Sequence, residues 1–383
     1  MSRDDFWRIS SMFHLADNRS SQAKSDKLHK TSNFQNIMQD KWKKYYRFSP
    51  NLNLDEAMIP FTGRLSFLQY IRGKPIPWGI KAYILASSST GYIYRMHIYS
   101  GKNKDIINIQ QLVGYMVEDL SGSSYMLYID NYYTSPKLLQ SLREKSIRCT
   151  GTLRKNRLLN KPLCAKISTM SKGEIKFYTN EPEKNLTLAI WKDKREVLFL
   201  SNHRQAEKTQ VLVGVNQQVK EIPTMRIHYN DKARGVDNAN KNCNVYRYNH
   251  AEKKWWKKIF EQIVQITLSN IYIIYKHLNS KPKSKFDCHM EIITYLIHND
   301  QIEKPLKLKH YLDWVPLKKK YLSEVKIEDS GQQSNKKDFR LTCKNKNCSK
   351  KSDLHCVGCT QLSSFICVLC LPICFIEYHE NKF

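Results

Sequence analysis

The chain has 383 residues, of which 63 are Lys or Arg and 35 are Asp or Glu, so its formal net charge at pH 7 is +28. A hydrophobic content of 41% is ordinary for a folded protein and excludes wholesale disorder. The length allows more than one domain. The positive charge predicts a polyanionic partner, because each phosphate that a protein contacts releases counterions. Charge alone leaves open a basic surface that is merely solvated, or a ribosome-like scaffold.

The N-terminus carries no predicted targeting segment. Asp4 and Asp5 stand where a signal peptide would place positive charge, and no apolar run follows them. The most apolar long stretch, Ile259–Leu278, is interrupted by polar residues such as Glu261 and Asn270. We therefore expect a core helix there rather than a membrane span, in an intracellular protein that has reduced cysteines and no membrane partner.

The first two thirds of the chain predict helices followed by an α/β core. Residues 1–50 place Phe6, Ile9, Met12 and Phe13 at helical spacing. Residues 51–245 contain runs typical of strands: Ala82–Ala86, Tyr92–Tyr99, Tyr125–Ile129, Leu186–Trp191 and Val197–Ser201. Between them, Asn108–Leu120 and Ser135–Glu144 are predicted helices. Alternating strands and helices favour an α/β fold with a mixed sheet.

The remaining third predicts helices, a tether and a cysteine-rich domain. A long helix at about Lys253–Leu278 belongs to a helical region at 246–322, which a basic linker at 279–285 interrupts. Residues 323–342 are polar and charged, as in a linker. Residues 343–383 hold seven of the 11 cysteines and form the last predicted domain.

Three carboxylates, far apart in sequence, stand at places where an active site is expected. Asp130 follows the run Tyr125–Ile129 and precedes a predicted helix, and the carboxyl end of a strand is where α/β sheets place active sites. Asp55 opens a run that predicts a strand and a turn, and Asp237 precedes the long helix. If they converge at one sheet edge, they could hold two Mg²⁺ ions, which prefer hard oxygen ligands. Asp237 could equally be a helix cap.

The cysteine-rich tail predicts zinc binding, since clustered thiols in a reducing compartment favour metal over disulfides. Two tetrahedral Zn²⁺ ions need eight ligands, and a segment this short has too little core to fold unaided. His355 is a spare or alternative ligand, the ligand pairs could interleave in a cross-brace, and Cys367 or Cys370 could be a bystander. The predicted ligands are Cys343, Cys348, Cys356, Cys359, Cys367, Cys370, Cys374 and His379.

Two basic segments are candidate DNA contacts. Arg154, Lys155 and Arg157 lie in a compact basic loop, where they could hold phosphates, although a plain surface loop fits the same residues. Lys253 and Lys254 precede two tryptophans that we expect to anchor a helix in the core, while the lysines face solvent or phosphate. The basic runs at 281–285 and 318–320 are weak candidates for nuclear import.

Several stretches, in family order along the whole chain, resemble the piggyBac transposases. They are MSRDDFWRISSMFHLADN, LDEAMIPFTGR, IRGKPIPWGIK, YIDNYYTSPKLLQSLREK, CTGTLRKNR, WKDKREVLFLS, YNDKARGVDNANKNCNVYRYNHAEKKWWKK and CFIEYH.

The resemblance implies an RNase H-like mixed-sheet core with flanking helices and a small C-terminal zinc-binding domain. The family's three catalytic Asp residues fall on Asp55, Asp130 and Asp237, where they would bind Mg²⁺ or Mn²⁺. The implied chemistry is cut-and-paste phosphoryl transfer at transposon ends: nicking, hairpin formation by the freed 3′-hydroxyl, and joining into TTAA targets. The implied partners are double-stranded DNA, both transposon ends and target, and a second copy of the chain. The implied compartment is the nucleus, and the tail resembles the family module that recognises transposon-end DNA.

Some positions depart from the family pattern. Asn240 stands where the family usually has a further Asp, and Ala233 and Arg234 precede Gly235 where the family commonly has M-G-G-V-D. The sequence also begins inside the family pattern, so we expect a truncated N-terminal region. The main hypothesis is a transposase. The alternatives are a domesticated, catalytically impaired DNA-binding protein, and an adaptor whose zinc module binds a protein.

Overall fold

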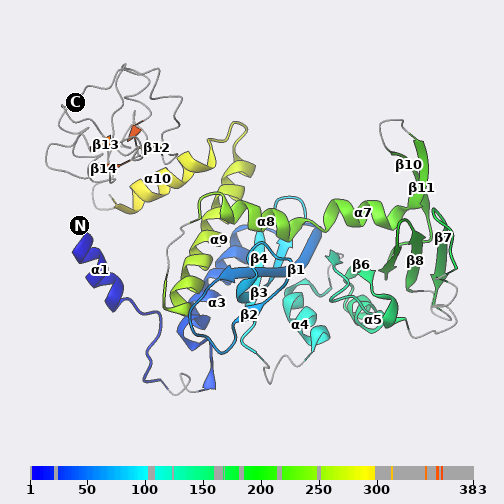
Figure 1. The fold of residues 1–383 in the computed structure, drawn as a ribbon, viewed down its shortest axis with the longest axis horizontal. Coiled ribbons are helices and arrows are strands. Elements are labelled where there is room, and N and C mark those ends of the chain that lie inside the picture. The colour runs from blue at the N-terminus through cyan, green and yellow to red at the C-terminus, as the bar shows by residue number, and fades with distance from the viewer. Residues whose placement is uncertain are drawn as a thin grey trace. The chain divides into compact units, whose positions relative to one another are not determined.

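A computed structural model describes residues 2–20, 25–101, 108–122, 125–158, 167, 169–180, 185–213, 218–247 and 252–297, together with four short strands nearer the C-terminus. The chain divides into two compact units, Met1–Ile293 and Thr294–Phe383. Figure 1 traces the elements in chain order from blue to red.

The first unit is built on a mixed nine-stranded sheet. Its central part has the strand order β4-β3-β1-β5-β6, formed by β1 (Asn51–Pro60), β3 (Trp78–Ser87), β4 (Ile93–Ile98), β5 (Met126–Ile129) and β6 (Arg148–Leu153). The pairs β4–β3 and β3–β1 are antiparallel, whereas β1–β5 and β5–β6 are parallel. This arrangement confirms the predicted mixed α/β fold and fits an RNase H-like core.

Further strands lengthen the sheet at both ends. Beyond β6 lie β9 (Glu196–Ser201), β8 (Thr187–Lys192) and β7 (Ile175–Thr179), all antiparallel to their neighbours, while β2 (Gln69–Tyr70) pairs with β3. A separate hairpin joins β10 (Lys208–Val213) to β11 (Gln218–Pro223). Two of these strands, β8 and β9, match the predicted runs, but the sequence analysis missed the hairpin.

The helices fall into those that precede, interrupt and follow the strands. They are α1 (Arg3–Met12), α3 (His29–Tyr45), α4 (Ile109–Met116), α5 (Pro136–Glu144), α7 (Thr224–Lys232), α8 (Gly235–Asn244), α9 (Trp255–Leu278) and α10 (Lys285–Ile297), with short 3-10 turns η1 (Glu118–Leu120) and η2 (Lys155–Arg157). The predicted helix starts are confirmed at α4 and α5, where Asn108 and Ser135 cap the first turn with their side chains.

The open edge of β4 is covered by side chains rather than by another strand. Gln35 and Gln39 of α3 bind the carbonyl oxygen and the amide of Met96 at 2.8 and 2.7 Å. Asn270 of α9 binds both backbone groups of Ile93, at 3.0 and 2.8 Å. These bonds satisfy edge groups that would otherwise stay unpaired or pair with another chain.

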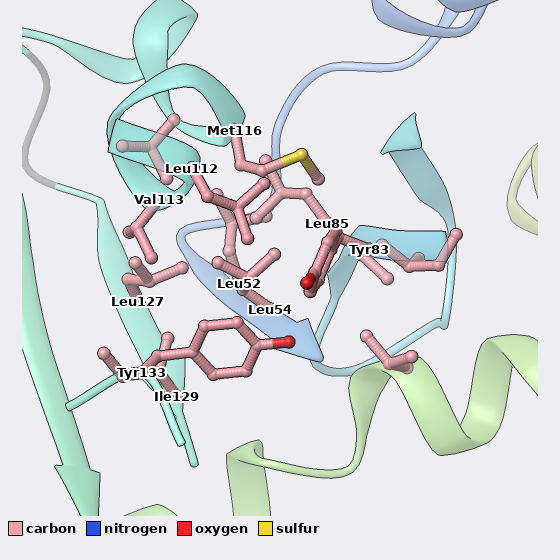
Figure 2. Close-up of a cluster of buried hydrophobic side chains, with 14 of the residues drawn as sticks. Leu52, Leu54, Tyr83, Leu85, Leu112, Val113, Met116, Leu127, Ile129 and Tyr133 are labelled. Carbon is pink, nitrogen blue, oxygen red and sulfur yellow. The ribbon is translucent and has the colours of Figure 1, made fainter. Parts of the chain in front are cut away.

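One face of the central sheet packs against α4 to form an apolar cluster (Figure 2). Leu52 and Leu54 of β1 lie there with no solvent exposure, next to Leu85 and Leu127 from the neighbouring strands. Each fully buried aliphatic side chain of this kind contributes about 1.5–3 kcal/mol to folding. The cluster therefore fixes the strands whose opposite face carries the candidate site.

The second unit has two short strand pairs in its described part. β12 (Leu312–Asp313) pairs with β15 (His355–Cys356), and β13 (Leu341–Thr342) pairs with β14 (Lys351–Ser352). Within the segments that the structure describes, no helix is both long and apolar enough to cross a membrane.

Candidate active site

Two of the three predicted carboxylates lie on adjacent parallel strands at equivalent positions. In the β1–β5 register, Leu54 stands opposite Ile129. Asp55 and Asp130 are the next residues along each strand, so the register brings their backbones side by side where β5 ends. Asp55 lies in the middle of β1 rather than opening a strand, which corrects the sequence interpretation.

A third strand, β6, places a hydroxyl group next to Asp130. Gly151 of β6 stands opposite Ile129, so Thr152 follows next to Asp130. The Thr152 hydroxyl donates a hydrogen bond of 3.0 Å to Oδ1 of Asp130. Thr152 belongs to β6, and this bond orients the Asp130 carboxylate.

Asp55 is held in surroundings that disfavour its negative charge. Burial raises its pKa to about 7, and the neighbouring Glu56 carboxylate acts in the same direction, while Lys74 opposes both. Its Oδ1 accepts a 2.8 Å hydrogen bond from the backbone amide of Glu56. A partly desolvated carboxylate near another carboxylate is stabilised by a bound cation, so the donor chemistry of Asp55 and Asp130 fits Mg²⁺ or Mn²⁺.

Tyr229 of α7 lies close to the same two carboxylates. Burial raises its pKa to about 12, a hydrogen bond with Thr152 opposes that rise, and the charges of Asp130 and Asp55 add to it. Its phenol therefore stays protonated at neutral pH and can donate a hydrogen bond at the site. No motif in the sequence identified Tyr229.

Asp237 is exposed and is the third residue of α8. The residue at the cap position is Arg234, so Asp237 is not the helix cap that the sequence analysis kept as an alternative. The first turn of α8 is fixed to β1, because the Val236 amide donates a 2.9 Å hydrogen bond to the Asn53 side chain. Asn53 is two residues before Asp55 on β1.

Within the described segments, no three His, Cys, Asp or Glu side chains are grouped closely enough to hold a metal ion. The strand register joins Asp55 and Asp130, whereas Asp237 is connected to them through the start of α8. Metal binding by all three carboxylates remains a prediction.

The positions that depart from the family pattern lie at the start of α8 and one turn into it. Arg234 is exposed with φ −100° and ψ 7°, so its backbone needs no glycine. Gly235 is the position that requires the small residue. A Cβ there would lie 2.8 Å from the Ser87 carbonyl oxygen and 3.0 Å from Cβ of Asn53. Asn240 lies one helical turn beyond Asp237 on α8.

Two of the residues predicted to contact DNA hold the loop that follows Asp130. The Arg157 guanidinium donates to the carbonyl oxygens of Asn131 and Tyr132 at 2.9 and 2.8 Å, and also to that of Thr134. Nε of Arg154 donates to the Asn131 side chain at 2.9 Å. Phosphate contact by Arg154, Lys155 and Arg157 stays a prediction.

The lysines before α9 are more available to a partner. Lys253 and Lys254 are exposed, whereas Trp256 is 4% exposed and packs in the core, as expected. Lys257 donates to the backbone oxygen and hydroxyl of Ser10, at 2.9 Å each. DNA contact by Lys253 and Lys254 also stays a prediction.

The predicted zinc ligands lie outside the described residues, apart from the backbone of Cys356 in β15. The alternative ligand His355 is likewise described only as backbone in that strand.

Comparisons with known proteins agree with this architecture. A family model described as Transposase IS4 matches residues 1–272. The human PiggyBac transposable element-derived protein 3 is 26% identical over 313 residues, covering 78% of this chain and 52% of that protein. The human PiggyBac transposable element-derived protein 2 is 24% identical over 296 residues, covering 72% and 48%. The chain thus spans about half the length of these relatives.

Among solved structures, the cryo-EM structure of a piggyBac transposase synaptic complex with hairpin DNA resembles this chain with a TM-score of 0.68 and 22% sequence identity. The match covers 80% of this chain and 65% of the solved chain. At that identity the likeness shows a common fold.

Proposed function

Because the chain belongs to the piggyBac-type transposase family, we propose that it cuts and joins DNA by metal-dependent phosphoryl transfer, with Asp55, Asp130 and Asp237 as metal ligands. The observation that supports this most is the parallel register that puts Asp55 and Asp130 next to each other. The substrates we propose are transposon ends and TTAA target sites in double-stranded DNA.

The residues of the chain prepare the site in distinct ways. Thr152 orients the Asp130 carboxylate through its hydroxyl, and Arg157 holds the loop carbonyls that follow Asp130. Burial of Asp55 strengthens its attraction to a cation. When bound, a pair of Mg²⁺ or Mn²⁺ ions supplies Lewis acidity to the attacking and leaving oxygens of the phosphodiester.

Cleavage of an end-bearing duplex and of a DNA hairpin in Mg²⁺ or Mn²⁺ tests this function. Asp130→Asn should lower the cleavage rate by about 10²–10³-fold or more, because the site loses a charge that cannot be replaced by an amide. Asp40→Asn is the matched control, since Asp40 is an exposed residue of α3 whose carboxylate pairs with Lys43 one turn away. Equal cutting by wild type and Asp130→Asn would contradict the proposal.

A second candidate function is DNA binding without strand transfer. Asn240, in place of the family's further Asp, and the lack of a three-carboxylate cluster among the described residues both favour it. An excision assay on a reporter with cognate ends compares the chain with an Asn240→Asp, Arg234→Gly double variant. Excision by the double variant alone would favour the impaired form, and excision by both would favour the transposase.

For the tail, we propose two Zn²⁺ ions bound by the cysteines between Cys343 and Cys374 and by His379, in a module that recognises end DNA. The net charge of +28 supports a DNA partner. We also propose that the protein acts in the nucleus as a homodimer. Metal analysis of the purified chain should give two zinc per chain and fewer after Cys356→Ser, and an unchanged zinc content would contradict this assignment.

A further inference from the structure

One buried side chain joins all three segments that carry the proposed metal ligands. Asn53 of β1 is 2% exposed. Its Nδ2 donates to the carbonyl oxygen of Tyr128 on β5 at 3.0 Å, and its Oδ1 accepts from the amide of Val236 on α8 at 2.9 Å. A single amide side chain can donate to one backbone group and accept from another at the same time.

Each residue that takes part in these two hydrogen bonds lies one or two positions before a proposed metal ligand. Asn53 and Asp55 are two residues apart on β1, so they project from the same face of the strand. Tyr128 is two residues before Asp130, and Val236 directly precedes Asp237. The Asn53 amide therefore sets the spacing between the backbone of the Asp55–Asp130 pair and the backbone of Asp237.

The bond to Val236 also replaces a missing helix cap. The first amides of a helix have no partner within the helix and are usually capped by the side chain at the cap position. Arg234 occupies that position in α8 and makes no side-chain cap bond. The Asn53 side chain of β1 supplies the acceptor instead, so the helix start is bonded directly to the sheet.

Close packing reinforces this connection. Gly235 approaches Asn53 and Ser87 so closely that an added Cβ would lie at 3.0 Å or less from atoms of each. Val236 is fully buried beside them. The first turn of α8 can therefore shift only if the contact with Asn53 is lost.

We propose that Asn53 is a positioning residue for the metal site: it holds the start of α8, which carries Asp237, against the strands that lead to Asp55 and Asp130, so that the three carboxylates can close around a divalent cation. This inference rests on the proposed function. Removing such a positioning partner typically weakens metal affinity by about 10–100-fold.

The experiment compares Asn53→Ala with Asn270→Ala in the full chain. Asn270 is the matched control, because it is also 2% exposed and also makes two hydrogen bonds to backbone, but at the far edge strand β4. Mn²⁺ affinity is measured by titration calorimetry without DNA, and stability by thermal unfolding. Both variants should lose comparable stability, whereas only Asn53→Ala should lose Mn²⁺ affinity, by about 10-fold or more.

A second variant, Gly235→Ala, disturbs the same contact from the helix side and should also weaken Mn²⁺ binding by about 10-fold. Wild-type Mn²⁺ affinity in either Asn53→Ala or Gly235→Ala, when folded, would overturn the inference. A wild-type chain that binds no Mn²⁺ would instead overturn the proposed function, so the two failures are distinguishable.

Discussion

The two faces of β1 differ in chemistry although their residues alternate along one strand. Leu52 and Leu54 point into the apolar cluster with α4 (Figure 2), while Asn53 and Asp55 alternate with them on the opposite face, where Asn53 bonds the start of α8. The apolar face holds the strands in register, and that register brings the polar residues together. The geometry of the proposed site therefore depends on packing against the opposite face of the same strand.

The largest loss of stability is expected on the apolar face of β1. Leu54→Ala removes a fully buried side chain, so we expect a loss of about 3 kcal/mol in the free energy of unfolding. Urea denaturation measures it, and Ile37→Ala is the control, because Ile37 is 48% exposed on α3 and should cost less than about 0.5 kcal/mol. Equal losses in both variants would mean that the cluster does not hold the sheet.

The apolar face also carries a histidine that predicts sensitivity to acid. Burial lowers the pKa of His97 to about 4, and the charge of Arg95 acts in the same direction. The ring packs against Tyr83 and Tyr115. Because the unfolded chain takes up the proton near pH 6.5, this contribution to stability is complete above that pH and is lost as the pH falls towards 4.

We expect His97 to account for about 2 kcal/mol of the stability difference between pH 7 and pH 4.5. Urea denaturation of wild type and His97→Gln at both pH values measures it, with the exposed His277→Gln as control. An unchanged pH dependence in His97→Gln would disprove the assignment.

A smaller effect is expected from Arg157→Lys on the polar side. Lys cannot make the forked contacts of the guanidinium with the carbonyl oxygens of Asn131 and Tyr132, so the loop after Asp130 should loosen. We expect about a 10-fold slower cleavage of DNA, with DNA affinity little changed. Arg154→Lys is the comparison variant, and a fall in affinity with normal cleavage at saturating DNA would assign Arg157 to phosphate contact instead.

The smallest expected effect is a gain in stability when the charge of Asp55 is removed. Without divalent metal, Asp55→Asn should raise stability at pH 8 by about 1 kcal/mol, because the ionised carboxylate is disfavoured by burial. The gain should grow as the pH rises from about 4 towards about 7, where the raised pKa makes ionisation costly to the folded protein. Thermal unfolding in EDTA at pH 4 and pH 8 measures it, and a loss of stability at pH 8 would refute it.

Much of the sheet was predictable because its strands and caps are locally encoded. The apolar run before Asp130 became β5, and Ser135 followed by Pro136 starts α5 where expected. The start of β1 was not predictable, since Asn51 and Asn53 are poor strand formers that tertiary contacts hold in place.

The helix that carries Asp237 was also missed, and for a related reason. The sequence of α8 contains Gly235 and four asparagines, which have low helix propensity, so its hydrogen bond to Asn53 and its packing on the sheet outweigh local preference. The roles of Thr152 and Tyr229 likewise depend on neighbours brought together by strand pairing. The motif resemblance predicted three catalytic carboxylates, whereas the neighbours of Asp130, such as Thr152, emerge only from the fold.

The bond between Asn53 and Val236 spans 183 residues of chain, which has a consequence for biosynthesis. Closing so long a segment costs conformational entropy that must be met by contacts formed beforehand. Because translation runs from the N-terminus, the residues of β1, β5 and β6 are synthesised well before Asp237. A nascent chain that ends in that interval carries Asp55 and Asp130 but not Asp237, so it lacks one of the three proposed ligands.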